Sequence, residues 1–173
     1  MTTFSKLLRT ILQNSDKREI TLYDELETCK LYLQLEAMRF GDKFRYQFNM
    51  DPSTDLKSIQ VPALIIQPFI ENAVWHGIMP KKEGGTVTIS VEETDHAVSC
   101  VIDDDGIGRE TSKKNEFKTG LSAHQSKGIH LTQSRLTLDS QLNERNATVE
   151  IIDKSNGQGK ATGTKVILTF NEY

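Results

Sequence analysis

Residues 71–77 read Glu-Asn-Ala-Val-Trp-His-Gly and follow an apolar run that extends from residue 61 to residue 70. The run predicts a core helix over residues 61–78, with Pro62 in its first turn and Pro68 as an internal kink. An acid, an amide and an imidazole thus stand together at the end of a buried helix. This combination favours a functional site, although a helix that merely ends in polar residues has the same pattern.

The second motif, residues 104–108, reads Asp-Asp-Gly-Ile-Gly and directly follows a segment of alternating apolar residues. Asp104, at the end of the expected strand, can accept a hydrogen bond from an exocyclic amine such as that of adenine. Gly106 and Gly108 permit close approach of the backbone to a ligand. Alone, the motif also fits an ordinary Asp-Gly turn. We expect the two motifs to face each other across one nucleotide site.

The spacing of apolar residues predicts helices and strands along the whole chain. The predicted elements are a helix at 1–13, a helix at 22–40, a strand at 44–50, a loop at 51–60, the helix at 61–78, hairpin strands at 87–91 and 98–102, a polar lid or loop at 109–127, a helix from 128, and closing strands at 147–151 and 166–170. Thr21 provides a hydroxyl cap for the second helix and Gly41 ends it. This order predicts an α/β fold: a two-layer α/β sandwich with a mixed sheet of about five strands and helices on one face.

The composition excludes several classes of function. The chain has 173 residues, a formal net charge of −3, 36% hydrophobic residues and 26% charged residues. These values predict a globular protein with no basic footprint for nucleic acid and no polybasic patch for a membrane surface. No apolar run reaches membrane-spanning length. Cys29 and Cys100 lack the spacing of metal or redox motifs, so we expect both to be core residues.

Several polar residues are candidates for binding a magnesium–nucleotide complex. Asn72 offers an oxygen of the kind that Mg²⁺ prefers, and Glu71 could position water or accept a proton. His76 lies one turn beyond Asn72 on the same helix face. Gly128 begins a helix whose amide groups point toward an anion, with Lys127 beside it. An ordinary helix start explains these last two residues equally well.

Gly163-Thr164 begins the last strand and could bring a hydroxyl group to the same site, although a plain strand start explains it better when it is taken alone. In this order, Glu-Asn-Ala-x-x-His-Gly, Asp-x-Gly-x-Gly, a polar lid and Gly-Thr resemble the ATP-binding domain of the gyrase/Hsp90/histidine-kinase/MutL superfamily. More narrowly, residues 31–36 (Leu-Tyr-Leu-Gln-Leu-Glu), Arg39-Phe40 and residues 61–73 resemble the LytS-type sensor histidine kinases.

The resemblance implies a Bergerat-type ATP-binding fold and the catalytic domain of a two-component sensor histidine kinase, with ATP and Mg²⁺ as cofactors. It implies that Asn72 binds Mg²⁺, that Glu71 is the catalytic base, and that Asp104 reads the adenine amine. The other ATP-binding residues that it implies are Gly106, Gly108, Gly128, Gly163 and Thr164. His76 and Lys127 complete the predicted site because of their positions beside Asn72 and Gly128.

Three positions depart from the family pattern. Asp105 stands where the family has Asn, which adds negative charge near the nucleotide. Trp75 stands where a basic residue often touches phosphate, so Lys127 or the other lysines of residues 109–127 are candidates for that contact. His130 replaces a further glycine of the second glycine box, which is expected to weaken nucleotide affinity.

None of the four histidines stands in the Pro-His-Phe context of the LytS-type phosphoacceptor. We therefore expect a C-terminal fragment that transfers the γ-phosphoryl group of ATP to a histidine elsewhere, which then phosphorylates a response regulator. Residues 1–43 are predicted to link to the dimerisation and phosphoacceptor region, and residues 44–173 to form the ATP-binding domain. The expected location is the cytoplasm, with no contact of this piece with a membrane or with nucleic acid.

Two other functions share these motifs. A superfamily ATPase would use ATP to drive a conformational change. Gyrase- and Hsp90-like members, however, carry a catalytic Glu four residues before the Asn, where this chain has Pro68. A non-enzymatic nucleotide-binding regulatory module is the other alternative, suggested by Trp75 and the reduced second glycine box.

Overall fold

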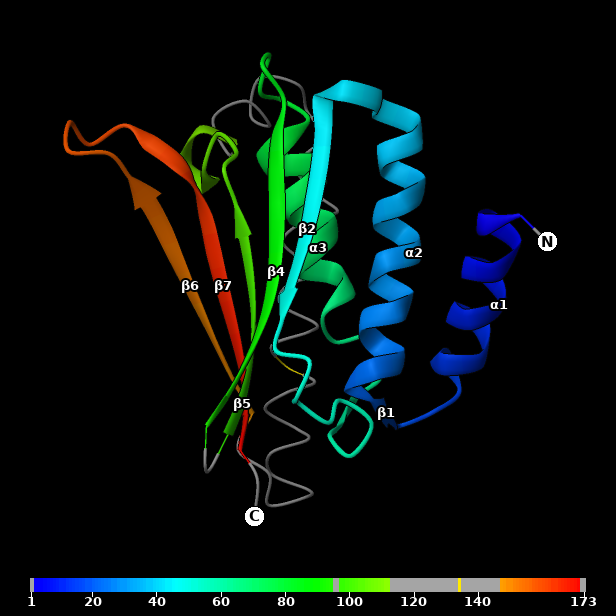
Figure 1. The fold of residues 1–173 in the computed structure, drawn as a ribbon. Helices are drawn as coiled ribbons and strands as arrows, with labels where there is room; N and C mark the ends of the chain where they lie inside the picture. Colours follow the sequence, from blue (N-terminus) through cyan, green and yellow to red (C-terminus); the bar gives the residue numbers. More distant parts are fainter. Residues whose placement is uncertain (1, 95–96, 113–133, 135–146, 172–173) are drawn as a thin grey trace.

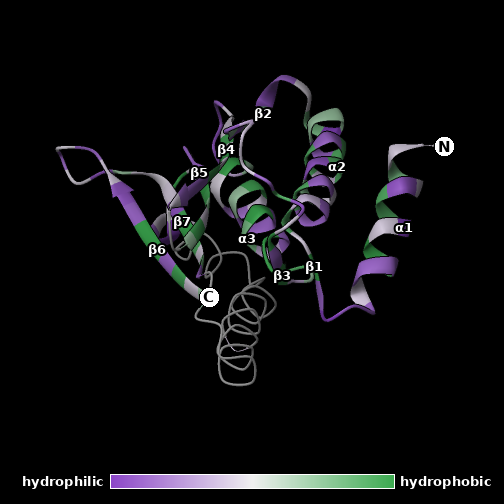
Figure 2. Cartoon of the chain, turned by 60° about the horizontal axis from the view of Figure 1, so that its bottom comes forward, coloured by the Kyte–Doolittle hydropathy of each residue, from purple (hydrophilic) through white to green (hydrophobic). Residues whose placement is uncertain are grey.

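The computed structural model describes residues 2–94, 97–112, 134 and 147–171. Its elements are α1 (Thr3–Ser15), β1 (Glu19–Thr21), α2 (Leu22–Phe40), η1 (Gly41–Lys43), β2 (Phe44–Met50), β3 (Gln60–Pro62), α3 (Gln67–Asn72), η2 (Ala73–Ile78), β4 (Gly85–Thr94), β5 (Ala97–Asp104), β6 (Ala147–Ser155) and β7 (Ala161–Asn171). The helices lie on one side of the main sheet, with α1 beyond α2 (Figures 1 and 2). The predicted two-layer α/β sandwich is confirmed.

The main sheet has five strands in the order β2-β4-β5-β7-β6. Strands β2 and β4 are parallel, and the other neighbours are antiparallel, so the sheet is mixed as predicted. Asp104 at the end of β5 pairs with Val87 of β4 on one side and with Thr164 of β7 on the other. This register brings the second motif, at the end of β5, beside the Gly-Thr pair near the start of the neighbouring strand β7.

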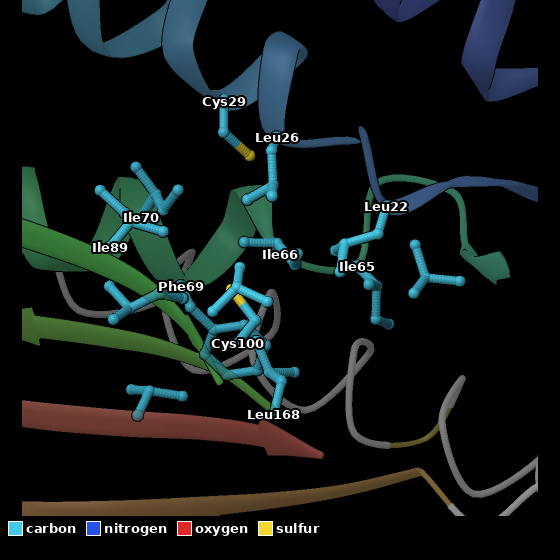
Figure 3. Packing of buried hydrophobic residues seen from close by; sticks show 14 of the residues in the cluster. Leu22, Leu26, Cys29, Ile65, Ile66, Phe69, Ile70, Ile89, Cys100 and Leu168 are labelled. Carbon is cyan, nitrogen blue, oxygen red and sulfur yellow. The ribbon is translucent and has the colours of Figure 1, made fainter. Parts of the chain in front are cut away.

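The hydrophobic core fills the space between the sheet and the helices α2 and α3 (Figure 3). From α2, Leu26 and Cys29 point toward the layer of α3, where Leu26 lies above Ile66, and strand residues such as Leu168 close the core from below. Both cysteines are buried and free, in agreement with their predicted role as core residues. Burial of this apolar surface stabilises the packing of α3, and it therefore holds the first motif against the sheet.

Helix α2 forms where the pattern of apolar residues predicts it. The hydroxyl group of Thr21 accepts a hydrogen bond from the backbone N–H of Asp24 at 3.0 Å, which satisfies one of the free amides of the first turn. Gly41 follows the last turn with φ 55°, a conformation that glycine adopts without steric strain. Leu22, Leu26, Cys29 and Leu33 are all buried, so this face of the helix packs into the core.

The predicted core helix over residues 61–78 is wrong in its first third. Residues 60–62 form β3, which pairs with β1; neither short strand was predicted. The helix begins at Gln67, and Pro68 therefore lies in its first turn, where its missing N–H has no cost. Residues 73–78 continue it as a π-helix, a form often found at functional sites.

The cause of the late helix start is Glu25 on α2. Its buried carboxylate accepts hydrogen bonds from the backbone N–H groups of Leu64 and Ile66, each at 2.9 Å. These bonds hold residues 63–66 in a turn in which Leu64 has φ 57°, outside the helical region. The turn ends where α3 starts, so one buried side chain of α2 determines where the helix that carries the first motif begins.

Candidate functional site

The two motifs are in direct contact. Gly106 packs on the backbone of Gly77 so closely that a Cβ atom at residue 106 would lie 2.4 Å from the Gly77 Cα. The backbone N–H of Ile107 donates a hydrogen bond to the Gly77 carbonyl oxygen at 3.0 Å. Contact at this distance requires glycine at residue 106, because any side chain there would overlap the backbone of residue 77. The π-helix and the end of β5 therefore form one continuous surface.

Asp104 is the buried carboxylate of this surface, with 4% of the residue exposed. Its Oδ1 accepts a hydrogen bond from the backbone N–H of Gly106 at 2.8 Å. Burial raises the pKa of Asp104 to about 6, while hydrogen bonds from the backbone of Gly106 and Thr164 and the charge of Lys154 oppose the increase. A Cβ atom at residue 77 would lie 2.8 Å from Oδ1, so Gly77 keeps the space beside the carboxylate open.

Two further glycines hold the second motif against the start of β7. Gly163 has φ 128°, and a Cβ atom there would lie 1.9 Å from the backbone oxygen of Asp104. Gly108 has φ 75°, and its Cβ atom would lie 2.7 Å from the Cβ of Ala161. Both positions combine a left-handed conformation with close packing, which favours glycine. They bring the buried Thr164 beside Asp104.

The polar residues of the first motif point to two sides of the helix. The side-chain amide of Asn72 donates to the Pro68 carbonyl oxygen at 2.5 Å, which leaves the side-chain oxygen as the atom for a ligand. Glu71 accepts a hydrogen bond from Gln67 at 2.8 Å, and its charge helps to raise the pKa of Tyr32, after burial and Glu36. The Glu71 carboxylate is thus on the side of α2. His76 is partly buried on the π-helix.

The donor set suits a Mg²⁺ ion that reaches the site with a nucleotide. The described residues include no group of three or more His, Cys, Asp or Glu side chains that could hold a metal ion. Mg²⁺ retains several waters and binds through one or two protein oxygens plus substrate phosphates. A single oxygen from Asn72 fits that mode of binding.

Asp105, the residue that departs from the family's Asn, contacts the start of β4 and Lys81. Its Oδ1 accepts a hydrogen bond from the backbone N–H of Thr86 at 2.9 Å and lies 3.5 Å from the Nζ of Lys81. The Lys81 ammonium also donates to the Asp105 backbone oxygen at 2.6 Å. The carboxylate therefore fixes the start of β4, and Lys81 offsets its negative charge.

Trp75 packs on α2. Its indole N–H donates to the hydroxyl oxygen of Tyr32 at 3.0 Å, and its ring lies edge-on to Phe40 with centroids 5.5 Å apart. The guanidinium of Arg39 lies 5.0 Å from the centre of the indole ring. Tyr32, Arg39 and Phe40 belong to the sequence segment that resembles LytS-type kinases. Their spacing along the helix does not predict that they contact Trp75.

Two predicted site residues, Lys127 and Gly128, lie outside the described residues. The same holds for His130 and for residues 113–127 of the predicted lid. A separate open cavity of about 590 Å³ is lined by Asp51, Ser53, Thr54, Val91, Glu92, Glu93 and Thr94. None of the predicted site residues lines this cavity. Among the described residues, no helix is long and apolar enough to cross a membrane.

Family models match both parts of the chain. Residues 59–173 match the model described as histidine kinase-, DNA gyrase B- and HSP90-like ATPase, and residues 1–44 match a histidine kinase model. The sensor histidine kinase YpdA of Escherichia coli (strain K12) is 38% identical over 104 residues, which cover 60% of this chain and 18% of that protein. The sensor histidine kinase/phosphatase LytS of Staphylococcus aureus (strain MRSA252) is 32% identical over 126 residues, with coverages of 67% and 21%. The chain spans about a fifth of the length of these relatives.

Solved structures share the fold. The histidine kinase domain of a blue-light activated kinase from Erythrobacter litoralis has a TM-score of 0.57 and 16% identity, and the likeness covers 98% of this chain and 75% of that one. The histidine kinase ThkA, solved in complex with the response regulator protein TrrA, has a TM-score of 0.57 and 14% identity, with coverages of 98% and 47%. At this level of identity the likeness shows a common architecture and leaves the roles of individual residues open.

Proposed function

Because this chain belongs to the histidine kinase-, DNA gyrase B- and HSP90-like ATPase family, as the catalytic ATPase domain of a LytS-like sensor histidine kinase, we propose that it binds Mg-ATP where its two motifs meet. The observation that carries the proposal is the buried Asp104 carboxylate, beside which Gly77 leaves the space that a side chain would fill. A neutral apolar pocket would not recognise adenine by its amine, whereas a carboxylate accepts directly from it.

In this proposal each residue has one task. Asp104 accepts a hydrogen bond from the adenine amino group, and the glycine backbones at 77, 106 and 108 permit the base to approach closely. Asn72 binds Mg²⁺ through its side-chain oxygen, and His76 contacts the nucleotide from the same helix. Bound Mg²⁺ would neutralise phosphate charge during transfer. Thr164 supports the Asp104 side of the site.

The proposed reaction is transfer of the γ-phosphoryl group to a histidine that is not among the four in this sequence. Glu71 is the proposed base that accepts the proton released by the attacking imidazole. Gln67 holds one oxygen of the Glu71 carboxylate, so the other is the oxygen that would take the proton. Such a transfer depends mainly on positioning and charge stabilisation. Lys127 and Gly128 remain proposed nucleotide contacts.

We further propose that a response regulator receives the phosphoryl group and that the domain works in the cytoplasm, where ATP is available. The ThkA complex with a response regulator supports the first point by analogy of fold. We also propose that residues 1–43 form a linking segment and that residues 44–173 form the ATP-binding domain.

Titration with a fluorescent ATP analogue tests the proposal. We expect saturable binding that is strongly weakened in Asp104→Asn and unchanged in Asp16→Asn, a matched change at an exposed position. Phosphotransfer to a separate fragment that bears the phosphoacceptor histidine tests the reaction, and Glu71→Gln should slow it. Nucleotide binding without transfer would favour a regulatory module, and an unchanged rate in Glu71→Gln would remove the base role.

A further inference from the structure

The guanidinium of Arg39 lies between aromatic rings at the C-terminal end of α2. It is 5.0 Å from the centre of the Trp75 indole and 5.1 Å from the centre of the Phe40 ring. Trp75 is itself fixed, because its indole N–H donates to the Tyr32 hydroxyl and its ring contacts Phe40 edge-on. Stacking on an aromatic face orients a guanidinium while its N–H groups remain free to bind an anion.

Other cations beside the second motif are already paired with carboxylates. The described pairs are Lys81 with Asp105, Arg109 with Asp153, and Lys154 with Asp103. Arg39 differs from them: its guanidinium contacts the Trp75 and Phe40 rings, and none of the ion pairs of the described residues includes it. Glu36, one turn earlier on α2, is buried; burial raises the pKa of its carboxyl group, and the charge of Arg39 opposes that increase.

Trp75 and the proposed Mg²⁺ ligand lie on one continuous helix, α3 followed by η2. Trp75 is three residues beyond Asn72, the proposed Mg²⁺ ligand, and two residues before Gly77, which contacts Asp104. If Asp104 binds the base, the phosphate chain extends toward Asn72 and hence toward the helix that carries Trp75. A triphosphate brings several negative charges, and a planar guanidinium can bind two phosphate oxygens at once.

We propose that Arg39, oriented by Trp75, binds the phosphate chain of the nucleotide and makes the site selective for ATP over adenosine. This inference rests on the proposed function, since it assigns a residue of α2 to the same nucleotide. In the related kinases a basic residue at the position of Trp75 often contacts phosphate. In this chain we assign that contact to Arg39, which lies on a different helix. Arg39 is a binding residue in this assignment, and Trp75 is a positioning residue.

Calorimetric titration of the 173-residue chain with ATP, ADP and adenosine, each in excess Mg²⁺, tests the assignment. Arg39→Gln should weaken ATP binding by about tenfold or more, weaken ADP binding less, and leave adenosine binding unchanged. Arg39→Lys keeps the charge but loses the planar fork, so it should give an intermediate affinity for ATP. Arg45→Gln, at an exposed position of β2, is the matched control and should bind as the wild type does.

The fluorescence of Trp75, the single tryptophan of the chain, gives a second measurement. ATP should change its emission in the wild type, and adenosine should not. Unchanged ATP affinity in Arg39→Gln would overturn the assignment while the proposed function stands. An equal loss for ATP and adenosine would also overturn it, because it would indicate a structural role. Absence of all nucleotide binding by the wild type would instead refute the proposed function, and this assignment with it.

Discussion

The raised pKa of Asp104 predicts that base recognition weakens in mild acid. The carboxylate accepts a hydrogen bond from the adenine amine only when it is ionised. With a pKa of about 6, about nine-tenths of the free protein carries the charge at pH 7 and about one-tenth at pH 5. The affinity should therefore fall about tenfold between these two pH values.

Adenosine is the best probe for this effect because it has no phosphate groups that titrate in the same range. Its dissociation constant would be measured by calorimetry at intervals from pH 5 to pH 8, for the wild type and for Asp104→Asn. The variant should bind weakly and show little dependence on pH. An affinity of the wild type that is constant from pH 5 to pH 8 would refute the argument that Asp104 binds the base.

The ionisation of Asp104 also affects the stability of the folded state. Acid should weaken binding of the base, but it should stabilise the fold. Burial is the main reason why the folded pKa of Asp104 is raised from 3.8 to about 6, so the native state holds the proton more tightly than the unfolded state. This stabilisation is complete below pH 3.8 and is lost as the pH rises through about 6. It amounts to about 3 kcal/mol, since each pKa unit corresponds to about 1.4 kcal/mol. Urea unfolding should show that the stability difference between the wild type and Asp104→Asn changes across this range.

Three other changes test separate parts of the structure. Gly106→Ala places a Cβ atom 2.3 Å from a backbone carbon of the neighbouring motif, so it should destabilise by about 1–3 kcal/mol and abolish nucleotide binding; Gly157→Ala, with open space around it, should do neither. Glu25→Ala leaves two backbone N–H groups without an acceptor and should reduce the free energy of unfolding by about 3 kcal/mol. Glu27→Ala, at a half-exposed position of the same helix, should change it by less than about 0.5 kcal/mol; equal urea midpoints for the two variants would contradict the role of Glu25. Removal of Mg²⁺ with EDTA should weaken ATP binding by the wild type but have no further effect on Asn72→Ala, and an equal effect on both proteins would exclude Asn72 as the metal ligand.

Local patterns were sufficient for most of the fold. Alternating apolar residues identify β2, β4, β5, β6 and β7, because each strand turns one face toward the core, a face that is only partly buried in the edge strand β6. The spacing of buried residues and the cap at Thr21 identify α2. The contact between the two motifs also agrees with residue types, since Gly106 permits contact with the backbone of Gly77, and Gly77 leaves space for the Asp104 carboxylate.

The beginning of α3 could not be read from its own residues. Residues 61–66 are apolar and fit a helix, but their backbone N–H groups bind a carboxylate that lies about 40 positions earlier in the chain. Trp75 and Asp105 are similar cases, because Tyr32 and Thr86, their hydrogen-bond partners, lie on elements that only the folded chain brings close. Local periodicity predicts which face of a helix or strand is buried, but it does not predict which distant residue a side chain contacts.

The nucleotide site at the junction of the two motifs is tested most directly by amide chemical shifts of the isotope-labelled chain during titration with Mg-ATP. The structure predicts saturable shifts concentrated at residues 72–77, 104–108 and 163–164, with further changes at Arg39 and Trp75. Absence of shifts, or shifts confined to the cavity at residues 51–54 and 91–94, would contradict this placement of the site.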